Sequence, residues 1–68
     1  MIKEFQEGEV YRNSKQTQDI MVYAIASEDD VEIVLAVGFV DRESEEMTKH
    51  GELVVKKSEL SDWELVAL

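Results

Sequence analysis

His50 is the only histidine of the chain, and the chain contains no cysteine. A hydrolase of the Ser–His–Asp type would need this histidine to meet Ser44, Ser58 or Ser61 beside an acid, in a pocket that excludes water. A chain of 68 residues has little volume for such a pocket, and the segment around His50 is polar. We therefore expect His50 to face water, and we expect no enzymatic activity and no catalytic residues.

Carboxylates are the other chemically active side chains. Glu28, Asp29 and Asp30 are consecutive, and with Glu32 or Asp41 they offer oxygen ligands for a divalent cation. Their spacing lacks the glycine and the closing glutamate of an EF-hand loop, and the three glycines of the chain are too scattered for a phosphate-binding loop. We interpret these acids as a solvated turn and expect neither a metal site nor a cofactor.

The charge balance restricts the classes of partner. Sixteen acidic residues face seven lysines and arginines, which gives a net charge of −9. Such a molecule repels phosphate, so direct binding to DNA or RNA and binding to anionic membranes are disfavoured. The N-terminus has no apolar targeting segment, no run is long enough to span a membrane, and cysteine is absent, so we expect a cytoplasmic protein.

The elements that must carry these side chains are predicted to be strands. Val10 and Tyr11 in "EVYRN" favour a short strand, and the polar "SKQTQD" leads from it to a second one. Residues 20–26 and 31–40 read as two further extended segments because they are rich in β-branched residues and lack a polar helical stripe. Ser27 to Asp30 is the turn between them, since adjacent carboxylates remain hydrated there.

Both faces of these two strands are apolar. Ile20, Val22, Ala24 and Ala26 alternate with Met21, Tyr23 and Ile25, and Val34 and Val40 lie on the second face of the next strand. A strand that is apolar on both faces needs a neighbour that covers the second face. The candidates are the C-terminal segment, a helix in 41–50 and another subunit. Gly38 is a candidate bulge where the long strand bends.

Two segments allow alternatives. Residues 41–52 form either a charged loop or a short helix over 42–50, and the loop is favoured because Met47 alone is apolar there. "ELVVKK" is the next strand. At the C-terminus, Ser61 to Glu64 fits a helical capping box, but the alternation of Trp63 and Leu65 around Glu64 favours a last strand.

Aromatic side chains have two interpretations as well. They line a peptide groove or they form the core, and a place in the core or in a dimer contact is favoured for Tyr23 and Phe39. Trp63 lies between Asp62 and Glu64, which makes it the best candidate for an exposed interface anchor.

Together these segments predict a single all-β domain over residues 1–68: a five-stranded antiparallel SH3-like barrel or a strongly curled meander. "EGEVYRN", the apolar hairpin and the closing "SELSDWELV" resemble the layout of short uncharacterised bacterial and phage proteins with SH3-like barrels. That resemblance implies the fold and a phage or prophage origin, and it implies no activity.

Two function hypotheses follow. The first is a non-enzymatic interaction module that binds a protein partner, or itself as a homodimer, through an apolar strand face; its predicted interface residues are Met21, Tyr23, Ile25, Val34 and Trp63. The alternative is an acidic mimic of nucleic acid that inhibits a DNA- or RNA-binding protein, based on acids clustered at 28–32 and 41–46.

Overall fold

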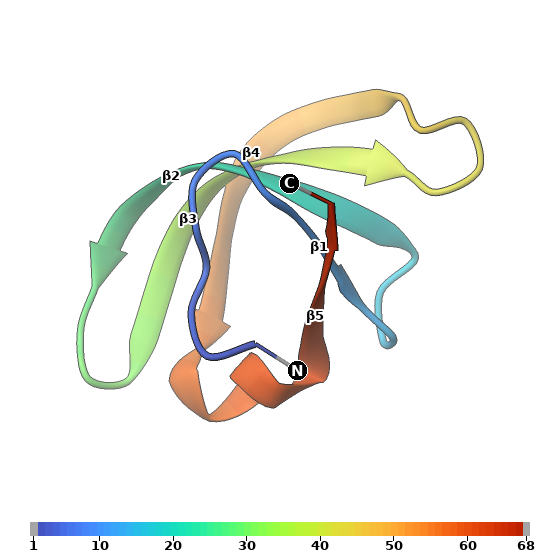
Figure 1. The fold of residues 1–68 in the computed structure, drawn as a ribbon. Helices are drawn as coiled ribbons and strands as arrows, with labels where there is room; N and C mark the ends of the chain where they lie inside the picture. The colour runs from blue at the N-terminus through green and yellow to red at the C-terminus, as the bar shows by residue number, and fades with distance from the viewer. Residues whose placement is uncertain (1, 68) are drawn as a thin grey trace.

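The computed structural model describes residues 2–67 (Figure 1). It contains five strands and one short 3₁₀ helix: β1 (Val10–Asn13), β2 (Gln18–Glu28), β3 (Glu32–Asp41), β4 (Met47–Lys56), η1 (Lys57–Asp62) and β5 (Trp63–Ala67). No helix among these residues is long and apolar enough to cross a membrane.

The five strands form one antiparallel sheet in the order β4-β3-β2-β1-β5. The sheet curls strongly, so that its two edge strands turn towards each other, and η1 connects them (Figure 1). Within residues 2–67 β4 and β5 are not paired with each other, so the sheet is not closed. The prediction of an all-β fold is confirmed in its form as a curled meander.

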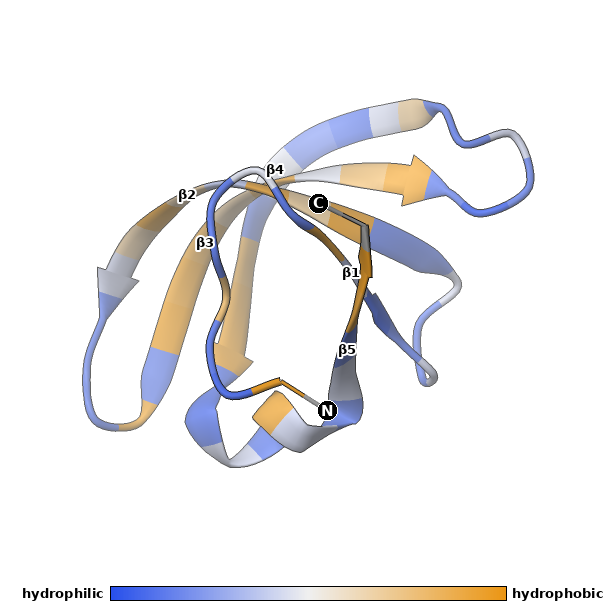
Figure 2. Cartoon of the chain, in the orientation of Figure 1, coloured by the Kyte–Doolittle hydropathy of each residue, from blue (hydrophilic) through white to orange (hydrophobic). Residues whose placement is uncertain are grey.

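The core lies on the concave side of this sheet. Every second residue of β3 is buried, as Ile33, Leu35 and Val37 show, and Figure 2 shows hydrophobic residues along much of this strand. The buried hydrophobic residues are Phe5, Tyr11, Ile20, Val22, Ile33, Leu35, Val37, Val55 and Trp63. The alternation predicted for residues 31–40 therefore gives the core face of β3 correctly.

Trp63 belongs to this core, and its predicted role as an exposed anchor is wrong. Only 5% of its surface is accessible, and its ring packs edge-on against Phe5 at a centroid distance of 5.7 Å. Phe5 in turn makes a T-shaped contact with Tyr11 at 4.8 Å. Glu64 points away from this core because neighbours in a strand face opposite sides, and Asp62 belongs to the preceding η1 rather than to β5.

The loop after β3 is shorter than the predicted loop over residues 41–52. β4 begins at Met47, so the loop is confined to residues 42–46 and no helix lies in 42–50. Residues 63–67 form β5, which confirms the predicted last strand and excludes the helix proposed from the capping box. The one short helix, η1, precedes that strand instead.

Bulges in β2 change which side chains share a face. The pairing of β2 with β3 shifts between Val22 and Ala24 and again between Ile25 and Ser27. An extra residue reverses the alternation after it. Ile25 therefore pairs with buried Leu35 on the core side, rather than lying beside Tyr23 on the outer side as predicted. It lies beyond the covered part of the core, and 39% of its surface remains accessible.

The buried carboxylate of Asp19, on the outer side of β1 and β2, binds one arginine from β1 and one from the β3–β4 loop. Asp19 accepts two hydrogen bonds from Arg12, at 2.9 Å each, and one from Nε of Arg42 at 2.8 Å. Arg42 also donates to the carbonyls of Asn13 and Gln16. These bonds, Arg12 first, hold the pKa of Asp19 below its ordinary value, and they connect the β3–β4 loop to the β1–β2 turn.

Candidate functional site

The outer face of β2, β3 and β4 carries apolar side chains that nothing within residues 2–67 covers. Cross-strand partners share a face of a sheet. The register places Met21, Gly38 and His50 in one row across the three strands, and Ala24, Ala36 and Glu52 in the next. We call the apolar residues and the histidine of this face the outer patch: Met21, Tyr23, Ala24, Val34, Ala36, Met47, His50 and Val54.

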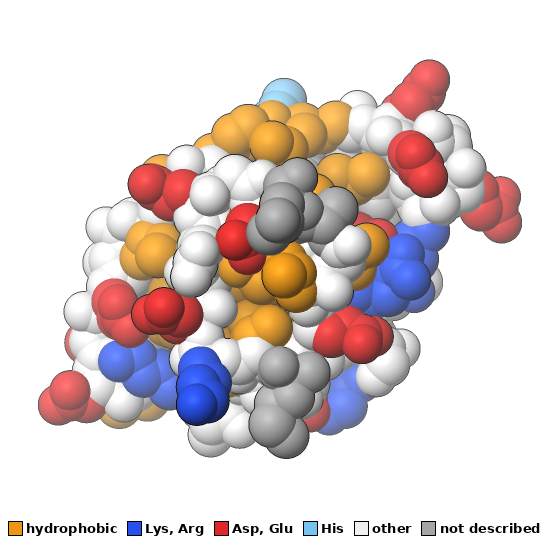
Figure 3. Space-filling view, in the orientation of Figure 1, with side chains coloured by type: hydrophobic (Ala, Val, Ile, Leu, Met, Phe, Trp, Pro, Cys, Tyr) orange, Lys and Arg blue, Asp and Glu red, His pale blue; other side chains and the backbone are white. Residues whose placement is uncertain are grey.

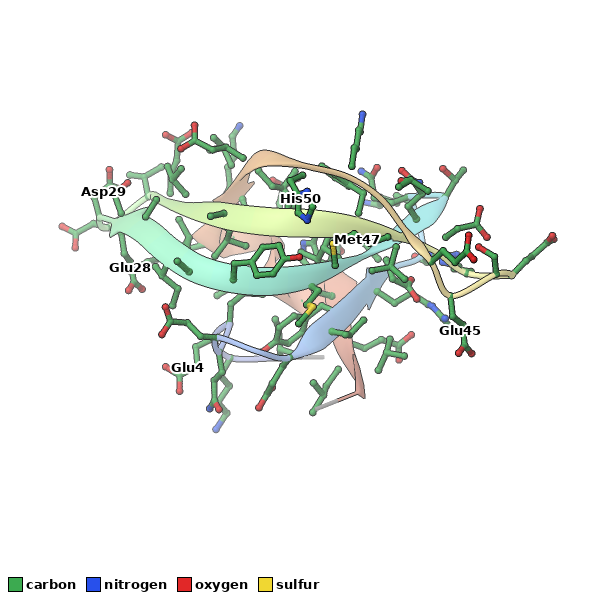
Figure 4. All side chains as sticks on the ribbon, turned by 90° about the horizontal axis from the view of Figure 1, so that it is seen from above. Glu4, Glu28, Asp29, Glu45, Met47 and His50 are labelled. Carbon is green, nitrogen blue, oxygen red and sulfur yellow. The ribbon has the colours of Figure 1, made fainter. Side chains whose placement is uncertain are left out.

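Tyr23, Met47 and His50 form the polar centre of the outer patch. The hydroxyl oxygen of Tyr23 lies 2.7 Å from Sδ of Met47 and 2.9 Å from Nε2 of His50. The rings of Tyr23 and His50 are tilted against each other at a centroid distance of 5.4 Å. In Figure 4, which looks onto this face, Met47 and His50 lie close together over the middle of the sheet.

A single hydrogen-bond chain satisfies all three groups. If Nε2 of His50 carries the proton, it donates to the oxygen of Tyr23, and the phenol then donates to the thioether of Met47, which accepts only weakly. The chain holds the Tyr23 ring across the sheet surface, which leaves 44% of this residue accessible. A large aromatic surface is thus oriented in advance and exposed to solvent.

Gly38 provides the space in which Met47 lies. A Cβ atom at position 38 would be 2.7 Å from Cε of Met47 and closer still to its sulfur. Gly38 itself keeps its register with Met21 and His50, so it is not the predicted bulge. The irregularity between β3 and β4 falls at the next step, between Phe39 and Val40.

Carboxylates mark both ends of the long hairpins that carry the outer patch. Glu28 and Asp29 lie at one end and Glu45 at the other, on either side of Met47 and His50 (Figure 4). Figure 3 shows the same distribution: the histidine sits among hydrophobic side chains at the upper edge, and acidic groups project at the far ends of the molecule.

The acidic turns at these ends are ordered by their own side chains. Oδ1 of Asp29 accepts hydrogen bonds from the backbone N–H of Glu32 and of Val31 at 2.7 Å each, and these bonds lower the pKa of Asp29. Asp41 accepts from the N–H of Ser44 and Glu43 in the same way, which lowers its pKa. Both carboxylates therefore stabilise turns, and no group of three or more potential metal ligands occurs among the described residues.

The predicted interface residues divide between the two sides of the sheet. Met21, Tyr23 and Val34 lie in the outer patch, whereas Ile25 points to the core side and Trp63 is buried. The structure brings Tyr23 together with two residues that the sequence placed in a loop, Met47 and His50.

Those two residues, with Val54, Ala24 and Ala36, are the part of the patch that the predicted interface lacked. Ala24 was predicted on the face of Ile20 and Val22, and the bulge after Val22 moves it to the outer face beside Ala36. Hydrophobic alternation gives no signal over "MTKHGE", because Met47 is the only apolar residue in this stretch. Val54 lies within the predicted strand "ELVVKK", and its pairing with Val34 brings it to the outer face.

Comparisons with known proteins give no further constraint. No family model matches the chain, and neither a curated protein nor a solved structure matches it. The resemblance to small bacterial and phage proteins with SH3-like barrels therefore stays a prediction.

Proposed function

We propose that this chain is a non-enzymatic protein-interaction module that binds its partner through the outer patch. The observation that carries the proposal is an apolar sheet face left open to solvent at Tyr23, Met47 and Val54, which are 44%, 36% and 54% accessible. Contiguous exposed apolar surface with polar surroundings is typical of protein-interaction sites. The small residues Ala24 and Ala36 keep the middle of the face flat enough for a partner to approach the sheet closely.

Charge determines the kind of partner that suits this face. Acids lie at both hairpin ends, and Glu52 lies beside Ala36 on the outer face itself. The chain as a whole carries −9. A second copy would bring the same negative charge to the contact, so a homodimer is disfavoured over a partner with an apolar centre and basic residues around it. This form of the proposal keeps the predicted strand-face contact and replaces self-association by a different protein. Its predicted cytoplasmic location and phage origin are unchanged.

The acidic mimic of nucleic acid is the competing proposal. It draws support from the two arginines, because both pair with Asp19 rather than with the acids of residues 43–46. At the other hairpin end Glu28 pairs with Lys57 at 3.2 Å, so the β3–β4 loop is the more strongly acidic end. A mimic binds by charge and loses its partner at high salt, whereas burial of the outer patch is much less sensitive to salt.

Affinity purification with matched variants separates these proposals. The bait is the full chain, with Tyr23→Gln/Val54→Gln as the test variant and Val31→Gln as the control. Val31 is also apolar and 63% accessible, but it lies in the β2–β3 turn rather than on the outer face.

We expect the wild type and Val31→Gln to retain the same partner proteins at about 0.05 M and at about 0.5 M salt. We expect Tyr23→Gln/Val54→Gln to lose these partner proteins at both salt concentrations. Retention by all three baits would contradict the outer patch as the contact surface. Loss from all three at high salt alone would favour the acidic mimic. Light scattering of the free protein checks the remaining case: we expect a monomer, and a dimer that dissociates in Tyr23→Gln/Val54→Gln would make the partner a second copy.

A further inference from the structure

A separate cavity opens on the core side of the sheet, where the β1–β2 turn approaches β4 and the start of β5. Its volume is about 220 Å³. Ile20, Phe39 and Lys49 form one row across β2, β3 and β4 along its wall. The remaining lining residues are Gln16, Thr17, Gln18, Leu53 and Trp63.

The charge of this cavity is opposite to that of the molecule. It is lined by one cation, Lys49, and by none of the carboxylates. The two other cavities of comparable size each combine acids with bases: Asp19, Asp41 and Glu45 with two arginines in one, and Glu4 and Glu9 with Lys3 in the other. In a chain with sixteen acids, a lysine without a neighbouring carboxylate makes this cavity distinct.

Lys49 is held at the cavity by an aromatic ring. Its ammonium group lies 5.2 Å from the centroid of Phe39, a cation–π contact that leaves the N–H donors free for an anionic acceptor. No ion pair joins Lys49 to an acid within residues 2–67, whereas Lys15 and Lys57 each have such a partner. The apolar walls from Ile20, Leu53 and Trp63 stand next to this single charge.

We propose that the cavity binds a small carboxylate that carries one aromatic or branched aliphatic group. The carboxylate pairs with Lys49, and the apolar group enters between Phe39, Leu53 and Trp63. The volume lies below the range of about 300–1,000 Å³ typical of sites for drug-sized ligands, so the ligand is the size of one amino-acid residue. A free aryl or alkyl carboxylic acid has this chemistry, and so does the C-terminal residue of a peptide. This inference is independent of the outer patch, which lies on the opposite face.

Trp63 is the only tryptophan of the chain and lines the cavity, so its fluorescence reports binding directly. The probe is phenylacetate, with phenylacetamide as the neutral analogue of the same shape. We expect a saturable change in Trp63 emission with phenylacetate, with a dissociation constant on the order of 1 mM, as suits a ligand of this size. Phenylacetamide should bind about fivefold more weakly, since it lacks the charge that pairs with Lys49.

Two variants that remove the same charge locate the interaction. Lys49→Gln should weaken phenylacetate binding about fivefold and leave phenylacetamide binding unchanged. Lys56→Gln, at the other end of β4 and outside the cavity, should leave both unchanged. Equal binding of the two probes, equal weakening by the two variants, or no saturable change with phenylacetate would overturn the proposal.

A further pair of probes identifies the source of the carboxylate. They are N-acetylated tetrapeptides ending in phenylalanine, one with a free C-terminus and one amidated. If only the free-acid peptide binds, at least as tightly as phenylacetate, the cavity recognises peptide C-termini. If phenylacetate binds and neither peptide does, the ligand is a free carboxylic acid. Binding of both peptides with equal affinity would contradict a role for Lys49.

Discussion

The two faces of the β4-β3-β2 half of the sheet are built from similar residues but differ in what covers them. On the concave face Leu35 and Val37 are closed off from water, in a core to which Trp63 and the N-terminal Phe5 contribute. On the convex face the equally apolar Tyr23 and Val54 remain open. An apolar side chain that the chain itself leaves exposed adds little to the stability of the fold. The comparison supports the proposal that the concave face stabilises the fold and that the convex face binds a partner.

Truncation of the concave face should have the largest effect on stability. Leu35 has no accessible surface, so Leu35→Ala removes buried contacts and leaves a cavity, at a cost of about 2–5 kcal/mol in the free energy of unfolding. In a domain this small, that loss is most of the expected stability. Urea unfolding followed by Trp63 fluorescence measures it, and a cost below about 1 kcal/mol would remove the distinction between the faces.

Asp19→Asn should have the next largest effect, about 1–2 kcal/mol at neutral pH, because Arg12 and Arg42 lose their charged acceptor but still reach solvent. The pKa of Asp19 is lowered in the folded state. Its contribution is therefore present above the unfolded pKa, near 3.9, and is lost as the pH falls through the lower folded value. The gap in stability between wild type and Asp19→Asn should close below about pH 4. A gap that is constant between neutral and acidic pH would contradict the assigned charge state.

Gly38→Ala tests how the outer patch is built. The added Cβ meets the flexible end of Met47 rather than backbone, so we expect Met47 to move and the stability to change by less than about 1 kcal/mol. The effect should vanish in the Met47→Ala background, which removes the clash. Double-mutant unfolding data measure this coupling, and additive effects would show that Met47 does not lie over Gly38.

Val54→Gln should have the smallest effect on the free energy of unfolding, within about 0.5 kcal/mol, because more than half of the side chain is accessible and it is not part of the buried core. Its effect on partner binding should nevertheless be large. We expect the reverse for a variant that is altered only on the concave face and still folds: its stability should fall and its partner binding should be unchanged. Unfolding and binding measured on the same protein test both halves of this prediction. A Val54→Gln protein that is strongly destabilised would place Val54 among the structural residues.

The hairpin of β2 and β3 could be predicted from the sequence because its signal is dense. Runs of β-branched residues alternate over residues 20–26 and 31–40, and three consecutive carboxylates favour a solvated turn between them. The predicted turn, residues 27–30, was displaced, because β2 continues to Glu28 and the turn covers residues 29–31. The last strand was predictable from the alternation around Glu64. These features depend on local composition, which is available without any knowledge of long-range contacts.

The rest depends on pairing that local composition does not encode. The first half of β4 is polar and is held in the sheet by backbone hydrogen bonds to β3, so periodicity does not reveal it. A bulge in β2 moves Ile25 from the outer face to the core side of the sheet. The sequence has no glycine at this point that would have indicated a bulge. Trp63 is flanked by acids and is buried all the same, because Phe5 reaches it from a segment outside the strands. Two of the five predicted interface residues were misplaced for these last two reasons.

The central claim is that the outer patch is the contact surface. Amide chemical shifts of the isotopically labelled chain, recorded with and without the protein that it retains most strongly, test this claim residue by residue. The account predicts that the perturbed amides cluster at residues 21–24, 34–38 and 47–54. Perturbations confined to β1, η1 and β5, with the outer patch unchanged, would contradict it.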